Sequence, residues 1–297
     1  MAIVLGANQY GKAENRVVRV LRDGARHEIR DLNVSTSLRG AFADAHVSGD
    51  QGAVLPTDTQ KNTAFAYAKD HASGPIEDYA LALGQHFVES VASVSGARVT
   101  IEEYAWRRID VDGQGHDHAF VRSGESVRET IVTVDDSGTW IISGVSDLVI
   151  AKTTGSEFRG FLTDEYTTLA EASDRILATS LVARWRYAHT DVSWDAVYAG
   201  VLDTLLETFA TKHSLALQHS LYAMGEAVLE RHPEVAEIRF SAPNKHHFPV
   251  DLERFGVSND GEVFIAADRP YGLIEATVER DDAPRAGSAW SAVPGFC

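Results

Sequence analysis

One polar stretch, Thr57–Thr63, places hydroxyl, carboxylate, amide and amine groups together without an apolar side chain. It leads directly into Ala64–Ala68, whose composition is typical of a buried helix. The start of a helix offers free backbone N–H groups and a partial positive charge, which together can bind an anionic ligand. An ordinary N-cap, in which Thr57 or Asp58 accepts hydrogen bonds from first-turn amides, explains the same residues. Taken alone, this stretch favours the N-cap.

A second polar segment, Pro243–Phe248, contains an amide, an amine and two imidazoles. A proline followed by an asparagine favours a turn, so a solvated turn is the simplest interpretation. The histidines His246 and His247 close to Asn244 are unusual for a mere turn. We therefore favour a functional role for this segment.

A long segment of low periodicity, residues 153–176, combines three aromatic side chains with several charges. A loop of this length in a compact domain is usually functional or disordered, and its aromatic content argues against disorder. Phe158 is either core filler or a platform on which a flat ligand stacks. Arg175 is either a bidentate clamp or the structural ion-pair partner of Asp174 or Glu171.

Two histidines, His116 and His118, would point to one face of a strand, as metal ligands can. The single cysteine, Cys297, excludes an intrachain disulfide and a thiolate zinc cluster. The sequence has no HExxH, CxxC or glycine-rich nucleotide-binding motif. We expect structural histidines here, no metal site and no cofactor.

The composition is that of an ordinary globular protein, with 44% hydrophobic and 24% charged residues in a chain of 297. A net charge of −16 argues against a nucleic-acid partner, whose phosphates would be repelled. No apolar run approaches the roughly 18–20 residues of a membrane span, and the N-terminus does not resemble a signal peptide. We expect an intracellular protein that binds neither nucleic acid nor membranes.

The same order of elements occurs twice along the chain. Residues 15–36 predict two strands joined by a turn, helices follow around 58–70 and 77–92, and extended segments around 97–109 and 118–134 precede a turn. The second half predicts extended chain at 139–152, a long polar connection, helices around 197–209 and 217–228, and strands around 237–241 and 274–278. This order predicts an α+β protein with two similar domains, residues 1–137 and 138–297, whose antiparallel sheets carry helices on one face.

Taken together, these segments resemble the urate oxidase (uricase) family along nearly the whole chain. The matching segments are Asn8–Lys12, Thr57–Thr63, Gly155–Phe161, Asp164–Leu169, Asp174–Ile176, Gln218, Leu221–Met224 and Pro243–His246. The resemblance implies two tandem tunnelling-fold (T-fold) domains and a homotetramer whose barrel-like tunnel carries active sites at subunit interfaces. It also implies oxidation of urate by O2 and water to 5-hydroxyisourate and hydrogen peroxide, in purine degradation, with no metal or organic cofactor.

The resemblance assigns a role to individual residues. Arg175 and Gln218 would clamp one edge of urate, and Phe158 would stack on its ring. The backbone of Thr57 and Asp58, from a neighbouring subunit, would hold the opposite edge. Further residues complete the site: the backbone amide of Leu217 as a substrate contact, Asn244 with the Thr57 hydroxyl as an oxygen or water site, and Lys12, Thr57 and His246 as a proton relay.

Two positions depart from the family pattern, because Pro56 stands where a small residue is expected and Leu217 where valine is more usual. The chain ends in Gly-Phe-Cys rather than the peroxisomal Ser-Lys-Leu, so we expect a cytoplasmic enzyme. The main alternative is a zinc-dependent T-fold enzyme that acts on a pterin or GTP, with His116 and His118 as ligands. A purine-binding assembly protein without catalysis is a second alternative.

Overall fold

A computed structural model describes residues 2–267 and 269–291 of the chain. The final Gly-Phe-Cys, which includes Cys297 and on which the predicted cytoplasmic location rests, lies outside these residues. The elements are, in order, β1 (Tyr10–Leu21), β2 (Glu28–Gly40), α1 (Ala43–Val47), α2 (Thr57–His71), α3 (Ile76–Ser90), β3 (Val94–Glu103), β4 (Trp106–Val111), β5 (Gln114–Arg122), β6 (Val127–Asp135), β7 (Gly138–Lys152), β8 (Leu177–Tyr187), α4 (Trp194–Thr211), α5 (Leu217–Arg231), β9 (Val235–Pro243), β10 (His246–Pro249), the 3-10 helix η1 (Glu253–Phe255), β11 (Phe264–Ala267) and β12 (Leu273–Glu279).

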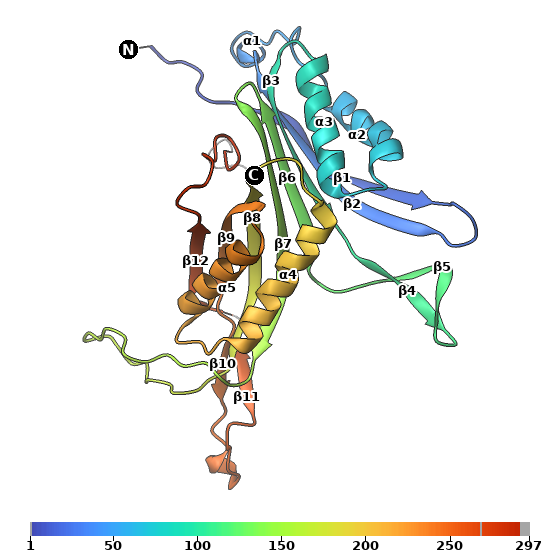
Figure 1. The fold of residues 1–297 in the computed structure, drawn as a ribbon. Helices are drawn as coiled ribbons and strands as arrows, with labels where there is room; N and C mark the ends of the chain where they lie inside the picture. The colour runs from blue at the N-terminus through green and yellow to red at the C-terminus, as the bar shows by residue number, and fades with distance from the viewer. Residues whose placement is uncertain (1, 268, 292–297) are drawn as a thin grey trace. The chain divides into compact units, whose positions relative to one another are not determined.

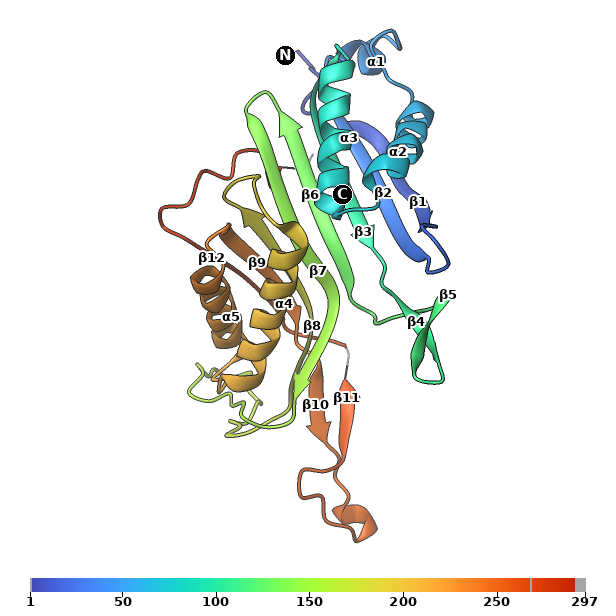
Figure 2. The same ribbon diagram turned by 45° about the vertical axis from the view of Figure 1, so that its right-hand side comes forward.

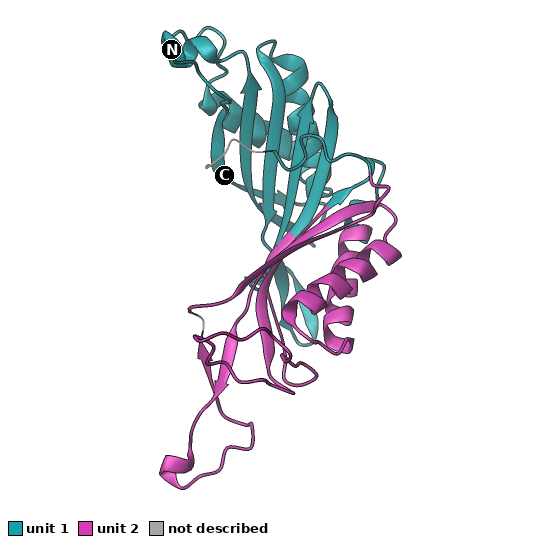
Figure 3. Cartoon of the chain, turned by 90° about the vertical axis from the view of Figure 1, so that its left-hand side faces the viewer, with its two compact units in different colours: residues 1–144, 186–196, 284–297 teal, residues 145–185, 197–283 magenta. Residues whose placement is uncertain are grey.

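The chain divides into two compact units (Figure 3). Unit 1 contains residues 1–144, 186–196 and 284–297, and unit 2 contains residues 145–185 and 197–283. The strand order is β1-β2-β3-β6-β7 in the first part of the main sheet and β7-β8-β9-β12 in the second. Segments after residue 185 return to unit 1, so these compact units are discontinuous along the chain. The tandem division at residue 137 stays a prediction.

Each unit is a sheet with helices on one face (Figures 1 and 2). In unit 1, α2 packs on β1, and α3 packs on β3 and β6. In unit 2, α5 packs on β9 and β12, and α4 lies beside α5 in both views. The strand pairs β1–β2, β2–β3, β3–β6 and β9–β12 are antiparallel. The α+β class predicted from the order of elements is therefore confirmed.

The helices form where apolar residues recur at helical spacing. In α3, Ile76, Tyr79, Leu83 and Phe87 lie on one face and are almost completely buried. Burial of each such side chain contributes about 1.5–3 kcal/mol. The Tyr79 hydroxyl also donates to the Ala64 carbonyl oxygen of α2 at 2.6 Å, which joins the two helices. Unit 1 thus holds α2, whose first turn contains the polar stretch, in a fixed position.

Two parts of the sheet differ from the sequence prediction. Residues 177–187, which the prediction included in a long polar connection, form β8. One face of this strand is fully buried and the other is partly exposed at residues 180, 182 and 184. Polar Thr179 on the buried face and apolar Val182 on the other obscure the alternation in the sequence. The extended segment predicted around 97–109 covers most of β3 and the beginning of a separate strand, β4, which pairs with β5 in a hairpin. No helix among the described residues is long and apolar enough to cross a membrane.

Candidate active site

Lys12 occupies a tightly constrained part of β1. Lys12 lies opposite Thr36 of β2, and the register shifts between Lys12 and Asn15, where Glu14 adopts a positive φ of 58°. A Cβ added to the preceding residue, Gly11, would overlap the backbone oxygen of Thr36. The strands approach so closely here that only glycine fits, and the bulge after Lys12 sets the direction of its side chain.

Hydrogen bonds join the start of α2 to the strand pair that carries Lys12. The Thr36 hydroxyl donates to Gln60 Oε1 at 2.8 Å, and Gln60 is completely buried. The Tyr10 hydroxyl donates to the Leu55 carbonyl oxygen at 3.0 Å. Because Thr57 lies less than one turn before Gln60, these bonds fix the first turn of α2 relative to β1 and β2.

Side chains do not cap the first turn of α2 as the N-cap interpretation predicts. The N-cap residue is Pro56, whose side chain has no hydrogen-bonding atom, and Thr57 begins the helix. Asp58 bonds to Lys61 and accepts a hydrogen bond from Asn62 Nδ2 at 3.0 Å instead. The charge-assisted bond from Lys61 lowers the pKa of Asp58, and the positive charge of Lys12 adds to this effect. The N-cap interpretation is wrong, and Lys12 and Asp58 share one electrostatic environment.

In unit 2, the long segment that contains Phe158 is fixed by backbone hydrogen bonds. Phe158 and Ala172 exchange two of them, at 2.8 and 3.0 Å. The Arg175 N–H donates to the Ser156 carbonyl oxygen at 2.7 Å, and Ser214 N–H, just before α5, donates to Gly155 at 2.9 Å. The segment therefore has a defined structure that places Phe158 and Arg175 close together.

Arg175 is not the ion-pair partner of Asp174 or Glu171 that the structural alternative predicts. Asp174 accepts a hydrogen bond from the Thr154 hydroxyl at 2.6 Å and one from Ser156 N–H at 3.2 Å. These bonds, the Thr154 bond first, lower the pKa of Asp174. Glu171 accepts from the Gly160 N–H at 2.9 Å. Both carboxylates thus shape the segment.

The Arg175 guanidinium lies over the ring of Phe158, with its Cζ atom 5.2 Å from the ring centroid. Its Nε is buried and has no hydrogen-bond partner among the described residues. Burial also lowers the pKa of Arg175. Phe158 in turn stacks on Phe161 at 5.0 Å, with 15° between the ring planes. A flat aromatic platform and an incompletely bonded cation therefore lie together, which suits a planar anionic ligand.

The start of α5 adds a third component to this group. Ala216 is the N-cap residue, and its methyl group cannot cap the first-turn amides. Leu217 is 1% exposed and anchors the helix, whereas the next residue, Gln218, is exposed. The Ser214 and Ser220 hydroxyls, 2.7 Å apart, brace this helix start. The Gln218 amide is thus available to a ligand at the beginning of a well-fixed helix.

Asn244 and His246 flank the end of β9. The Asn244 N–H donates to Gly272 at 2.9 Å, and the Lys245 N–H donates to Ala178 of β8 at 2.8 Å. Burial lowers the pKa of His246, and the positive charge of Arg175, followed by that of His247, adds to the shift. The neutral imidazole is therefore favoured at neutral pH, and a neutral imidazole can accept a proton.

The predicted site residues thus fall into two groups, one in each unit. The first half-site, in unit 1, contains Lys12, Thr57 and Asp58. The second half-site, in unit 2, contains Phe158, Arg175, Leu217, Gln218, Asn244 and His246. Sequence reasoning gave no site role to the supporting residues Gln60, Ser156 and Thr179. Each is completely buried, but Gln60 and Ser156 lie in polar stretches, so nothing in the local sequence marked their burial.

The two histidines considered as zinc ligands lie on β5. The rings of His116 and His118 meet edge to face, with centroids 4.5 Å apart. Among residues 2–267 and 269–291, no group of three or more His, Cys, Asp or Glu side chains could hold a metal ion. The geometry therefore gives the zinc-dependent alternative no support.

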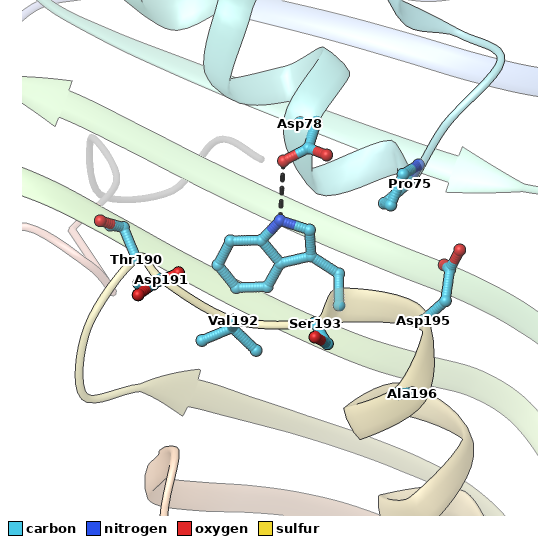
Figure 4. Close-up of a pocket in the computed structure, with 9 residues that line it drawn as sticks. Pro75, Asp78, Thr190, Asp191, Val192, Ser193, Asp195 and Ala196 are labelled. Atoms are coloured by element: carbon cyan, nitrogen blue, oxygen red, sulfur yellow. Dashed lines mark hydrogen bonds between the residues drawn. The ribbon is translucent and has the colours of Figure 1, made fainter.

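Unit 1 also contains a hollow (Figure 4). Trp194 lines it, and its indole N–H donates to Asp78 Oδ1 at 2.7 Å. The other lining residues are Pro75, Thr190, Asp191, Val192, Ser193, Asp195 and Ala196. None of the predicted site residues lines this hollow.

The chain matches the uricase family model over residues 8–133 and 141–275. It is 52% identical to the uricase of Arthrobacter globiformis over 295 residues, which cover 99% of this chain and 96% of that protein. It is also 36% identical to the uricase of Dictyostelium discoideum over 92% of this chain and 96% of that protein. The chain belongs to the uricase family.

The structure agrees with this membership. The crystal structure of the Arthrobacter globiformis uricase superposes on the chain with a TM-score of 0.94, and the match covers 98% of this chain and all of that one. The uricase fold is the T-fold, so the predicted fold class is confirmed. The two half-sites described above lie within the residue ranges that match the uricase model.

Proposed function

We propose that this uricase oxidises urate with O2 and water to 5-hydroxyisourate and hydrogen peroxide, as a step of purine degradation. Urate loses two electrons, O2 gains two electrons and two protons, and water adds to the oxidised ring. The observation that carries the proposal is the family match over nearly the whole chain, joined to the Phe158–Arg175 platform. No step of the proposed reaction uses a metal or an organic cofactor.

Urate binds on the second half-site. The ring stacks on Phe158, and such stacking contributes roughly 1–3 kcal/mol per base. Arg175 donates parallel N–H groups to one edge of the ring, and the unpartnered Nε supports this role. Charge-assisted bonds of this kind contribute about 1.5–3 kcal/mol each. The Gln218 amide both donates and accepts, which matches a ring N–H beside a carbonyl, and the backbone amide of Leu217 completes this edge.

The first half-site holds the opposite edge of urate through the backbone of Thr57 and Asp58. A neighbouring subunit supplies these residues in a homotetramer with sites at its interfaces and a barrel-like tunnel. The uncapped first turn of α2 supports this role, because its amides can bond to a ligand carbonyl. The tetramer is tested by measuring the molar mass of the purified protein in solution, and a monomer would contradict it.

Proton transfer makes urate reactive. Triplet O2 reacts poorly with closed-shell molecules, so the ring must become electron-rich by losing protons. Lys12, Thr57 and His246 form the proton relay, and the lowered pKa of His246 keeps its imidazole neutral and able to accept a proton. Asn244 and the Thr57 hydroxyl bind O2 or water beside the ring.

The decisive experiment is a urate oxidation assay with purified protein that has been treated with a chelator. We expect the urate absorbance to fall and hydrogen peroxide to form in a one-to-one ratio. The same mixture without O2 serves as the control and should be inactive. Stable urate absorbance under air would contradict the proposal, and activity that requires added zinc would revive the pterin or GTP alternative.

The predicted cytoplasmic location stays a prediction.

A further inference from the structure

Thr179 of β8 is a buried polar residue to which the proposed mechanism gives no role. Its side chain is completely buried, and its hydroxyl oxygen has no hydrogen-bond partner among the described residues. A buried hydroxyl without a partner is costly, and valine would fill nearly the same volume without that cost. This combination points to a partner that the hydroxyl gains during the reaction.

Thr179 lies directly opposite Asn244. The two residues are partners in an isolated antiparallel bridge, and the adjacent Lys245 N–H donates to the Ala178 carbonyl oxygen at 2.8 Å. That bond identifies Thr179 and Asn244 as a non-hydrogen-bonded pair. In such a pair the Cα atoms lie about 4.5 Å apart and the two side chains point to the same face. The Thr179 hydroxyl is therefore a near neighbour of the Asn244 amide.

The pair lies on the helix-covered face of the sheet. Alternate residues of a strand share a face, and Trp185, on the Thr179 face of β8, packs with its ring centroid 5.7 Å from that of Tyr198 in α4. On β9, Phe240 shares its face with Asn244 and packs against Gly225 of α5. The Thr179–Asn244 pair is thus on the side of the sheet from which α5 presents the second half-site.

We propose that Thr179 is a positioning residue that orients the Asn244 side chain. The inference rests on the proposed oxygen site at Asn244. Oxygen and the peroxide formed from it offer only acceptors, so Asn244 has to direct its Nδ2 donor toward them. The amide then turns Oδ1 toward Thr179, whose hydroxyl donates to it and holds this orientation. Rotation of an asparagine amide about χ2 follows a broad profile and costs little.

The test compares Thr179→Val, which removes the donor, with Thr179→Ser, which keeps it. We expect Thr179→Val to lower kcat/KM for O2 about tenfold, the effect of losing one hydrogen bond that orients Asn244, while KM for urate changes less than about twofold. Thr179→Ser should recover most of the loss. Ser180→Ala, on the opposite face of the same strand, is the matched control and should leave both constants unchanged.

A double-mutant cycle tests whether Thr179 acts through Asn244. In the Asn244→Ala background, Thr179→Val should have no further effect on kcat/KM for O2. Full additivity would overturn the inference, as would equal changes of the O2 and urate constants together with a lower Tm, which would indicate a structural role. If Asn244→Ala itself leaves kcat/KM for O2 unchanged, the proposed oxygen site is wrong. If Asn244→Ala lowers it and Thr179→Val does not, only the role of Thr179 is wrong.

Discussion

The starts of α2 and α5 lie in different compact units but share one structural feature, an N-cap residue without a capping side chain. In each helix the N-cap residue, Pro56 or Ala216, has a side chain that cannot cap, so first-turn amides are free to bond to a ligand. The first helical residues differ, because Thr57 is exposed and polar whereas Leu217 is 1% exposed and apolar. The two helix starts thus share one backbone arrangement but differ in the polarity and the burial of their first residue.

The surroundings of the two helix starts explain this difference. Around α2 the nearby groups are ionic and exposed, with Asp58 close to Lys61 and to the charge of Lys12. Around α5 they are aromatic and half-buried, with Arg175 lying over Phe158. We infer that the first half-site supplies Lys12 and Thr57 to the proton relay and holds one urate edge, whereas the second supplies His246 and most of the binding energy. Five predictions follow from this division.

The largest effect should come from Lys12→Ala in the first half-site. We expect kcat to fall about 10²–10⁴-fold, the range for loss of a general acid or base, while KM for urate changes less than about threefold. Steady-state assays of urate consumption measure both. Lys69→Ala, which removes an exposed lysine of α2, is the matched control and should be neutral. An unchanged kcat for Lys12→Ala would show that Lys12 is not part of the proton relay.

The second half-site should respond to Arg175→Ala mainly through binding. We expect kcat/KM for urate to fall about 10–150-fold, corresponding to the roughly 1.5–3 kcal/mol of a charge-assisted bond, mostly through a higher KM. Arg159→Ala is the control, since Arg159 is exposed and pairs with Glu157 at 2.9 Å. A fall in kcat alone would contradict the division of roles.

Mixing the Lys12→Ala and Arg175→Ala variants, assayed at urate concentrations well below the KM of Arg175→Ala, tests whether one site takes its halves from two subunits. In reassembled Lys12→Ala and Arg175→Ala mixtures, about a quarter of the sites would combine two intact halves, and activity should return to that extent. Activity that stays at the level of the separate variants after mixing would show that both half-sites come from one chain.

A smaller effect, on stability, is expected for Gly11→Ala. The added Cβ would overlap the Thr36 backbone, so the strand pair that carries Lys12 must move. We expect the free energy of unfolding to fall by about 1–3 kcal/mol, measured by denaturant titration or as a lower Tm. Gly74→Ala is the control, because nothing lies within 4 Å of its added Cβ. Equal stability of the two variants would show that β1 adapts without cost.

The smallest effect concerns the pKa of His246. Burial and the charge of Arg175 lower this pKa below the ordinary value of about 6.5. The stability linked to the neutral ring is thus complete above about pH 6.5 and is lost as the pH falls through the lowered pKa. Arg175→Gln should raise the pKa of His246, seen by NMR titration of labelled histidine and assigned with His246→Asn. An unchanged titration would mean that the two groups do not interact.

Much of the fold could be predicted from periodicity. The apolar positions of α3, with Tyr79, Leu83 and Phe87 at helical spacing, predict a helix because one face must be buried. By contrast, the strand pattern of β8 is obscured in the sequence, because polar Thr179 lies on its buried face and apolar Val182 lies on the other. Local patterns identify an element most clearly when its polar and apolar residues keep to separate faces.

The sequence by itself determined the family, through polar segments whose order along the chain is specific, and the residue types that can bind and deprotonate a purine. Only the tertiary structure decided which residues share a half-site, since Phe158 and Arg175 meet through backbone bonds at Ser156 and Ala172. It also decided that Asp174 supports the loop rather than pairing with Arg175. The physical reason is that hydrogen-bond partners and burial depend on contacts between distant segments, which spacing along one chain does not specify.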